Sequence, residues 1–329
     1  MKIKGILLAL LTFPLILTAQ AQWQDNGMPV RIADNIRWSE ASVNLSDGSV
    51  VVVWQDSRDE SLQNYAQKFD TAGNKLWGDA GINISHANDA ISTPKIAAGS
   101  DDSVFALWHY HDPDYINHYL VLQKFSASGE LLWSDTGISF IVDDFQYGTS
   151  LIPDENGGVY CCWADNDYNR AILLLCDGTI APGWDEAGTI LAAADYYYVD
   201  SFIQIDGDLV FAYLNSDTIY IQKFNADGQA QWGNEGYLIA TSVGSNSNLT
   251  AVKSSDGFWI GWKTHINSNY SLNLYRFWED GTSYWNDPIQ IISVSGYYIY
   301  EVAFVGDQDD GFYIGWRSSE EDVIRIAKI

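Results

Sequence analysis

The chain has 329 residues, of which 43 are acidic and only 17 are Lys or Arg, so its formal net charge at pH 7 is −26. A surface this acidic repels nucleic acid and anionic lipid headgroups, which excludes both as partners. It is compatible with cations, basic proteins and neutral glycans, and the charge alone would also keep an aromatic-rich exported protein soluble.

The first 21 residues are predicted to be a secretory signal peptide. Lys2 and Lys4 form a positive n-region, an apolar run extends from Gly5 to Thr18, and Ala19–Ala21 is a small-residue cleavage site. The apolar run is shorter than the roughly 20 residues that a membrane-spanning helix needs, and Pro14 interrupts it. We therefore expect a mature chain of residues 22–329 that has no membrane span. It would be secreted or periplasmic and could associate with the cell envelope.

A short motif with the pattern Trp-x-x-x-Gly returns along the mature chain. Its four full copies in the body of the chain are Trp77–Gly81, Trp133–Gly137, Trp184–Gly188 and Trp232–Gly236. A degraded fifth copy occupies 285–288, and a sixth copy, Trp23–Gly27, stands alone before the first repeat. The last repeat has no motif of its own, so the N-terminal copy supplies what it lacks. This arrangement predicts a ring that is closed by the N-terminal segment.

Each repeat is predicted to hold four short strands. In the first repeat these are 41–45, 49–54, 64–69 and 76–84, which are rich in β-branched and aromatic residues and are bounded by turn formers such as Asp47-Gly48. No segment of the mature chain keeps a 3.6-residue apolar period. A repeat of about 50 residues with four strands is typical of a β-propeller.

The predicted fold is therefore all-β, a six-bladed β-propeller of four-stranded blades in one domain, 22–329. The predicted blades are 40–86, 92–142, 147–193, 198–242, 247–293, and 298–329 together with 22–34. In the sixth blade, residues 22–34 would add the fourth strand beside the strand 322–329. One large aromatic residue ends the second strand of every repeat and is predicted to pack between blades. These residues are Trp54, Trp108, Trp163, Tyr213, Trp262 and Trp316.

The three cysteines all lie in the third repeat. Cys161, Cys162 and Cys176 occupy positions where other repeats carry apolar residues, so we interpret them as small core residues. A disulfide from Cys176 to one of the other two is the alternative, because an exported protein can form one.

The repeats resemble those of a known group of proteins. The segments 47–58 and 65–78, followed by Gly81-Ile82, are similar to repeats of large secreted bacterial β-propeller proteins, many of which carry a C-terminal type IX secretion sorting domain. The resemblance implies an exported propeller and no particular activity. No sorting domain follows Ile329 in this sequence, so we expect a periplasmic or freely secreted protein rather than one attached covalently to the surface.

Ligand-binding residues are expected in the loops that join second to third strands and one blade to the next. These loops are rich in tyrosine beside acids and amides, which suits a neutral hydroxylated ligand or a protein interface. The candidates are Tyr110, His111, Asp114, Tyr115, Asp165, Tyr168, Tyr197, Tyr270 and Tyr298. Tyrosine is also a good strand former, so ordinary packing stays open for each of them.

Metal ligands are the second kind of site considered. His109 and His111 with Asp112 have the residue types of a divalent metal site, although a polar loop with exposed imidazoles is the favoured interpretation. The segments 165–167 and 307–311 resemble calcium-binding loops but lack the terminal Glu of that pattern, so both are interpreted as turns. No cofactor is predicted, and calcium is the only candidate ion.

The predicted function is that of a non-catalytic binding or scaffolding module that recognises a protein or a glycan through its loop face. A purely structural component without a small-molecule site is a further alternative. The catalytic alternative is a carbohydrate-active hydrolase or lyase that uses a carboxylate pair at the central channel, with Asp56, Asp165, Asp217 and Glu320 as candidates. The sequence contains no Gly-x-Ser-x-Gly or His-Glu-x-x-His motif to support an enzyme.

Overall fold

The structure of the protein is a computed structural model that describes most of the chain. The described residues are 29–30, 36–58, 62–85, 92, 94–112, 114, 116–142, 147–165, 167–193, 201–244, 248–306, 311–319 and 323–329. Within these ranges the chain forms 23 strands and no helix, which confirms the all-β prediction.

The strands form antiparallel sheets in which each strand pairs with the next along the chain. The first two sheets contain β1 (Ile36–Asn44), β2 (Val50–Asp56), β3 (Gln63–Phe69) and β4 (Ile82–Asn83), then β5 (Lys95–Ala98), β6 (Val104–His111), β7 (His118–Phe125) and β8 (Ile138–Val142). The third and fourth contain β9 (Tyr147–Pro153), β10 (Val159–Ala164), β11 (Tyr168–Leu174) and β12 (Thr189–Ala193), then β13 (Ser201–Ile205), β14 (Asp208–Asn215), β15 (Thr218–Phe224) and β16 (Tyr237–Ala240). The fifth contains β17 (Thr250–Ser254), β18 (Gly257–Ile266), β19 (Asn269–Trp278) and β20 (Ile289–Ser295), and the sixth β21 (Ile299–Gly306), β22 (Phe312–Ser318) and β23 (Val323–Lys328).

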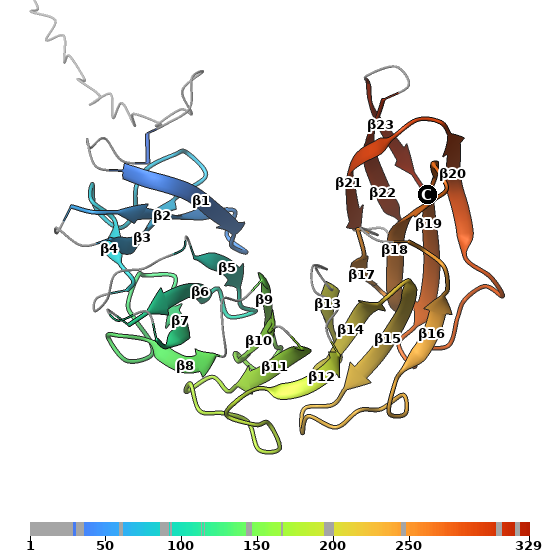
Figure 1. Cartoon of the computed structure of the whole chain (residues 1–329). Coiled ribbons are helices and arrows are strands. Elements are labelled where there is room, and N and C mark those ends of the chain that lie inside the picture. The colour runs from blue at the N-terminus through green and yellow to red at the C-terminus, as the bar shows by residue number, and fades with distance from the viewer. Residues whose placement is uncertain are drawn as a thin grey trace, which may run out of the picture.

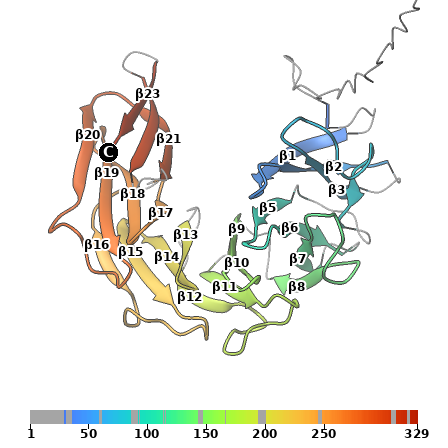
Figure 2. The same cartoon turned by 180° about the vertical axis from the view of Figure 1, so that it is seen from behind.

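The six sheets are the blades of a six-bladed β-propeller. The first strand of each blade contacts the first strand of the next, from β1 through β5, β9, β13 and β17 to β21. Figures 1 and 2 show these strands on the inner side of an arc, with the first and sixth blades at its two ends. Five blades have four strands and the sixth has three among the described residues.

The strand predicted to complete the sixth blade falls almost entirely outside the described residues. Of the segment 22–34, only Pro29 and Val30 are described, and they lie outside any strand. Ring closure by this segment therefore stays a prediction.

The fourth strands are shorter than predicted, because the Trp-x-x-x-Gly motif is a turn and not part of a strand. In the first blade β4 begins at Ile82, and Gly78 and Gly81 within the motif have φ of +73° and +68°, which a strand does not allow. A buried glutamine of the third strand holds this turn: the Gln67 side chain donates to the Gly78 carbonyl (2.5 Å) and accepts from the Trp77 amide (3.0 Å). Gln123 and Gln222 make the same donation to Ser134 and Gly233 in other blades.

The aromatic residues that end the second strands are buried, as predicted. Trp54, Trp108, Trp163, Tyr213, Trp262 and Trp316 are all less than 9% exposed. The motif tryptophans also connect blades: the indole N–H of Trp133 donates to the Cys176 carbonyl (3.2 Å), and that of Trp184 donates to the Ala226 carbonyl (2.8 Å). Each of these bonds joins one blade to the turn after the third strand of the next.

All three cysteines are free thiols. Cys161 and Cys162 are fully buried in the core of the third blade, and this burial raises the pKa of both. Cys176 is exposed. The interpretation as core residues therefore holds for Cys161 and Cys162 and is wrong for Cys176.

Candidate functional site

A group of four aromatic rings, three of them exposed, lies at the junction of the fifth and sixth blades. We call the group of His265, Tyr270, Tyr298 and Tyr300 the aromatic platform. His265 and Tyr270 come from the paired strands β18 and β19, while Tyr298 precedes β21 and Tyr300 lies on it. Two of the four, Tyr270 and Tyr298, are among the residues expected to bind a ligand.

The rings of the platform form two stacked pairs. The centroids of His265 and Tyr270 are 4.1 Å apart with 11° between the ring planes, and those of Tyr298 and Tyr300 are 5.9 Å apart with 18° between the planes. Tyr270 and Tyr298 join the pairs across the blade boundary, with centroids 5.6 Å apart. Rings at these separations are in the range of favourable aromatic contact.

Backbone hydrogen bonds hold the platform in place. Two hydrogen bonds to Ser319 fix the backbone of Tyr298. The Tyr298 amide donates to the Ser319 hydroxyl (2.8 Å), and the Tyr298 carbonyl accepts from the Ser319 amide (2.9 Å). On the other side, Asn267 and Ser268 form the tight turn between β18 and β19 with φ of +48° and +64°. The Gly296 amide donates to the Ser268 carbonyl (3.1 Å), which ties this turn to the connection that carries Tyr298.

The platform combines a covered base with open rings. Tyr270 is buried, whereas Tyr298 and Tyr300 are 56% and 49% exposed. Desolvation is the largest cause that raises the pKa of Tyr270, and the charges of the neighbouring Tyr298 and Tyr300 hydroxyls raise it further. The Tyr270 hydroxyl therefore keeps its proton and can donate a hydrogen bond. The Arg317 guanidinium lies 5.7 Å from the Tyr300 ring centroid, within the range of a cation–π contact.

A second group of rings lies on the second blade. The rings of Tyr110 and Tyr119 are tilted by 34° with centroids 5.4 Å apart, and His111 meets His118 edge-on at 6.3 Å. These pairs are opposite each other in the β6–β7 ladder, which continues to His111 and leaves only 112–117 as the loop. The expectation that Tyr110 and His111 belong to a loop is therefore wrong, because cross-strand ring pairs extend the hairpin. Asp114 is exposed in that loop, and Tyr115 lies outside the described residues.

The residues considered for a metal site do not form one. Asp112 uses both carboxylate oxygens within its own loop, accepting from the amides of Ile116 (2.8 Å) and Asn117 (3.2 Å) and from the Asn117 side chain (2.7 Å). The half-buried His109 has its pKa lowered to about 4 by desolvation and then by Lys95 and His118. In the part of the chain that the structure describes, no group of three or more His, Cys, Asp or Glu residues could hold a metal ion.

Asp165 and Tyr168 lie together on the third blade. The Asp165 carboxylate accepts from the amides of Asp167 (2.9 Å) and Tyr168 (2.6 Å) and forms an ion pair with Arg170. The Arg170 guanidinium lies 5.5 Å from the centroid of the partly exposed Tyr168 ring. The segment 165–167 is thus a turn, as interpreted. Tyr197 and most of 307–311 lie outside the described residues.

The carboxylates considered for catalysis have structural partners. Asp56 is fully buried and accepts from Arg58 through Nε (2.9 Å) and Nη2 (2.6 Å), while Arg170 holds Asp165. Both arginines also donate to the carbonyl of a motif residue, Ala80 in the first blade (2.8 Å) and Gly188 in the third (3.1 Å). Asp217 is exposed and accepts from the Thr218 hydroxyl (3.2 Å), and Glu320 lies outside the described residues.

Comparison with known proteins finds similar solved structures but no matching sequence family. No family model and no curated protein matches the sequence. Among solved structures it is similar to the polysaccharide lyase Uly1, with 10% identity and a TM-score of 0.49 over 88% of this chain and 76% of that one. It is also similar to an α-L-arabinanase of Penicillium chrysogenum (12% identity, TM-score 0.43, covering 92% and 95%) and a GH93 α-L-arabinofuranosidase of Fusarium graminearum (10%, 0.46, covering 90% and 95%). At this level of similarity the matches carry no information about the chemistry of the chain.

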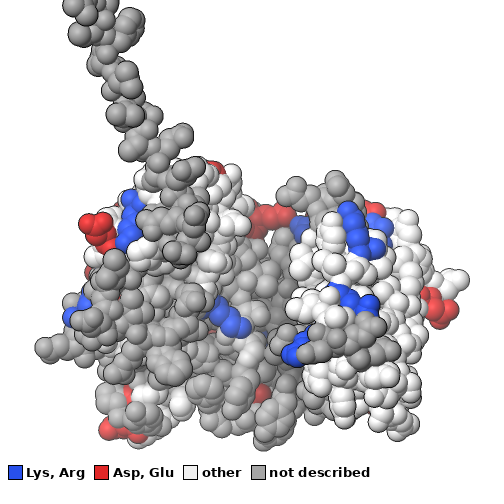
Figure 3. All heavy atoms as spheres, turned by 90° about the horizontal axis from the view of Figure 1, so that it is seen from above, with Lys and Arg blue, Asp and Glu red and all other residues white. Residues whose placement is uncertain are grey.

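The charged side chains on one face of the molecule are dispersed. Seen from above, lysine and arginine side chains and acidic side chains form separate small groups rather than one continuous field (Figure 3). Within the described ranges, no helix is long and apolar enough to cross a membrane.

Two platform residues, His265 and Tyr300, and the neighbouring Arg317 were not among the ligand-binding residues predicted from the sequence. All three lie on strands. The pattern Tyr298-Ile299-Tyr300 was the available signal, because alternate residues of a strand share a face. His265 and Tyr270 face each other across the turn Asn267-Ser268, a relation that only the hairpin register reveals.

Proposed function

We propose that the protein is an exported, non-catalytic binding module that holds a neutral glycan on the aromatic platform. The observation that carries this proposal is the pair of ring stacks, His265 on Tyr270 and Tyr298 beside Tyr300, joined across two blades. The rings of His265, Tyr298 and Tyr300 are exposed to solvent above the buried Tyr270. Export follows from the predicted signal peptide and from the resemblance to secreted bacterial propeller repeat proteins.

The rings supply both kinds of contact that a sugar needs. A pyranose or furanose ring presents C–H groups on its faces and hydroxyls on its edge, and tyrosine presents an apolar face and a polar tip. The exposed rings of Tyr298 and Tyr300 offer faces to a sugar, and the protonated Tyr270 hydroxyl and the Arg317 guanidinium are donors beside them. Because the rings are already held by packing and by the Ser319 bonds, little side-chain freedom is lost on binding.

The charge of the chain selects among glycans. A net charge of −26 disfavours uronic acid polymers and other anionic polysaccharides at low ionic strength, whereas neutral sugars are unaffected. The open platform favours a polysaccharide chain lying across it over a small sugar enclosed on all sides. We therefore assign neutral polysaccharides as the ligand class.

A binding role is favoured over hydrolysis because two of the four candidate carboxylates, those of Asp56 and Asp165, are occupied. Glycoside hydrolysis needs two carboxyl groups about 5 to 10 Å apart on either side of the scissile bond. The oxygens of Asp56 and Asp165 are instead engaged by Arg58, Arg170 and loop amides. These arginine–carboxylate ion pairs stabilise loops and do not face a substrate.

The test is binding of the mature chain, residues 22–329, to a panel of neutral and anionic polysaccharides, followed by titration of the best ligand. The Tyr298→Ala/Tyr300→Ala variant should weaken binding at least tenfold, equivalent to about 1.4 kcal/mol. Tyr237→Ala is the matched control, since Tyr237 is similarly exposed (43%) but lies on the outer strand β16 against Trp232. Tight binding that survives the platform variant, or binding to anionic polysaccharides alone, would overturn the proposal. Release of reducing sugar from the bound polymer would instead support the hydrolase.

A further inference from the structure

The outer edge of the sixth blade differs from that of every other blade. Its last strand, β23, exposes Ile324 and Ile326 by 81% and 73%, whereas the third strands β3 and β7 of the first two blades are almost entirely buried. Among the described residues, no strand pairs with this edge. An exposed apolar edge strand is a site for pairing with another strand.

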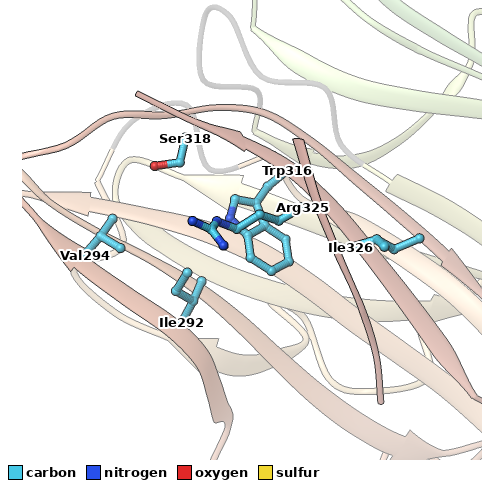
Figure 4. Close-up of a pocket in the computed structure, with 6 residues that line it drawn as sticks. All are labelled: Ile292, Val294, Trp316, Ser318, Arg325 and Ile326. Atoms are coloured by element: carbon cyan, nitrogen blue, oxygen red, sulfur yellow. The ribbon is translucent and has the colours of Figure 1, made fainter. Parts of the chain in front are cut away.

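A pocket of about 430 Å³ lies beside this edge. It is lined by Ile292 and Val294 of β20 and by Trp316, Ser318, Arg325 and Ile326 of the sixth blade. Figure 4 shows Trp316 and Arg325 side by side at its centre, facing the two β20 side chains. Trp316 is 8% exposed, and its indole N–H has no hydrogen-bond partner among the described residues. A buried donor of this kind requires an acceptor.

In other blades the same place is filled by the glycine of the Trp-x-x-x-Gly motif. Gly81 lies against the Trp54 ring so closely that a Cβ on it would be 2.8 Å from Trp54 Cη2, and Gly188 is in equally close contact with Trp163. Where Tyr213 replaces the tryptophan, its hydroxyl donates to the Glu235 carbonyl (2.7 Å), one residue before the motif glycine. The motif thus supplies a ring contact to Trp54 and Trp163 and a carbonyl acceptor to Tyr213, whereas the Trp54 indole N–H donates to the Asp56 carboxylate (3.4 Å).

We propose that the N-terminal segment 23–33 is the occupant of this edge, with Gly27 on the Trp316 ring, a backbone carbonyl beside it as acceptor for the indole N–H, and the following residues paired with β23. The segment carries the one copy of the motif, Trp23–Gly27, that no described strand follows. In the four blades with a full motif the fourth strand begins directly after the motif glycine. These strands begin at Ile82, Ile138, Thr189 and Tyr237.

The other blades also determine the register. In the other blades the residue after the motif glycine pairs with a residue of the third strand. That third-strand residue pairs in turn with the second-strand residue that comes just before the buried aromatic residue. Ile138 lies opposite Leu122, which pairs with Leu107, and Thr189 lies opposite Ala171, which pairs with Cys162. In the sixth blade Gly315 precedes Trp316 and pairs with Ile326. Met28 is therefore assigned opposite Ile326.

The same segment would join the sixth blade to the first. In four consecutive pairs of blades the motif tryptophan contacts the turn glycine after the third strand of the next blade: Trp77 with Gly129, Trp133 with Gly178, Trp184 with Gly228 and Trp232 with Gly281. Gly73 is the corresponding glycine of the first blade and shares their left-handed conformation, with φ of +85°. Trp23 would thus lie on Gly73 while Met28 pairs with β23.

Closure brings the two ends of the arc together. Only three residues lie between Ile32 and the start of β1 at Ile36, so the two Cα atoms are at most about 14 Å apart. In the described arrangement Pro29 and Val30 lie outside any strand, and the first and sixth blades stand apart (Figures 1 and 2). Pairing of the segment with β23 requires the sixth blade to lie beside the first and covers the exposed apolar edge of β23.

The test is a disulfide between the assigned partners. Paired residues in antiparallel strands have Cα atoms about 4.5 to 5.5 Å apart, within the range a disulfide needs. In mature chain carrying Cys176→Ser, the Met28→Cys/Ile326→Cys variant should oxidise to an intramolecular disulfide in most molecules, identified by peptide mass spectrometry. Met28→Cys/Ile324→Cys is the control, two residues out of register on the same exposed edge, and should oxidise far less.

Three results would overturn the proposal. Disulfide-linked dimers would assign the β23 edge to a second copy of the chain, equal oxidation of both variants would contradict the register, and two thiols that stay free in both variants would exclude the pairing.

Hydrogen exchange on the mature protein without these substitutions provides the second readout. The β23 amides should exchange at least about 100-fold faster when residues 22–33 are deleted, while those of β10 should be unchanged. Slow exchange of β23 without the segment would mean that something else covers the edge.

Discussion

Gly81 lies against the ring of Trp54, and a Cβ added to it would approach Trp54 Cη2 to 2.8 Å and the Ala66 carbonyl oxygen more closely still. The glycine is therefore required for packing as well as for its φ of +68°. This contact explains why the motif ends in glycine: the turn must pass flat over the buried aromatic residue before the fourth strand starts.

Gly78 in the same motif separates the two requirements. It has a similar φ of +73°, but a Cβ on it would meet nothing within 4 Å. Gly78→Ala should cost about 1 to 2 kcal/mol, the usual penalty of a left-handed conformation. Gly81→Ala should cost that amount and about 1 to 3 kcal/mol more for overpacking. Urea unfolding of both variants measures the difference. Equal losses would mean that Gly81 is selected for its backbone conformation alone.

The strands of this protein could be predicted well because the information is local and is repeated. Runs such as Val50–Trp54 and the Asp-Gly turns specify a strand and its end, and six similar units confirm one another. The fourth strands were predicted too long because the apolar residues Leu76 and Trp77 continue the β pattern into the motif. The positive φ at Gly78 depends on the Gln67 side chain, a contact that composition does not reveal.

The candidate site was harder to predict because it depends on relations between strands. Tyr270 and Tyr298 were chosen as loop tyrosines, yet their value as a site comes from lying 5.6 Å apart across a blade boundary. The length of the β18–β19 hairpin places His265 on Tyr270, and the Ser319 bonds place Tyr298. Neither relation has a signature in a single sequence.

The exposure of the cysteines predicts their reactivity. Cys161 and Cys162 are fully buried with raised pKa values, so neither forms the reactive thiolate in the folded protein, whereas Cys176 is exposed. Ellman's reagent should therefore react with one thiol in the native mature protein and with three in guanidinium chloride. Cys176→Ser should abolish the native reaction and leave two thiols after unfolding. Two unreactive thiols in the unfolded, unreduced protein would indicate a disulfide that the structure does not contain.

The buried ion pair of Asp56 and Arg58 should matter for stability and not for glycan binding. Asp56 is fully buried and Arg58 is largely buried, so Asp56→Asn would leave an uncompensated buried charge, at a cost of about 3 to 5 kcal/mol. Asp47→Asn is the control, since Asp47 is 54% exposed beside Lys68 and an ion pair this open to water should contribute far less to stability. Thermal unfolding and glycan titration of both variants measure the two effects. Loss of glycan binding by folded Asp56→Asn would move the ligand site to the first blade.

The depressed pKa of His109 predicts an acid-sensitive fold. Desolvation is the main cause, and the charges of Lys95 and His118 add to it, so the folded protein resists protonation of His109 down to a pKa of about 4. The unfolded chain accepts the proton near the ordinary value of 6.5. The contribution to stability is thus fully present above pH 6.5 and is lost as the pH falls toward 4, by at most about 3 kcal/mol.

His109→Gln removes the titrating group and keeps a neutral polar side chain. Between pH 7 and pH 4 the wild-type protein should therefore lose up to about 3 kcal/mol more unfolding free energy than His109→Gln, as measured by urea unfolding at each pH. His265→Gln, which replaces an exposed histidine, controls for the loss of a histidine as such. Parallel pH profiles for wild type and His109→Gln would show that the imidazole takes up its proton in the folded state as readily as in the unfolded chain.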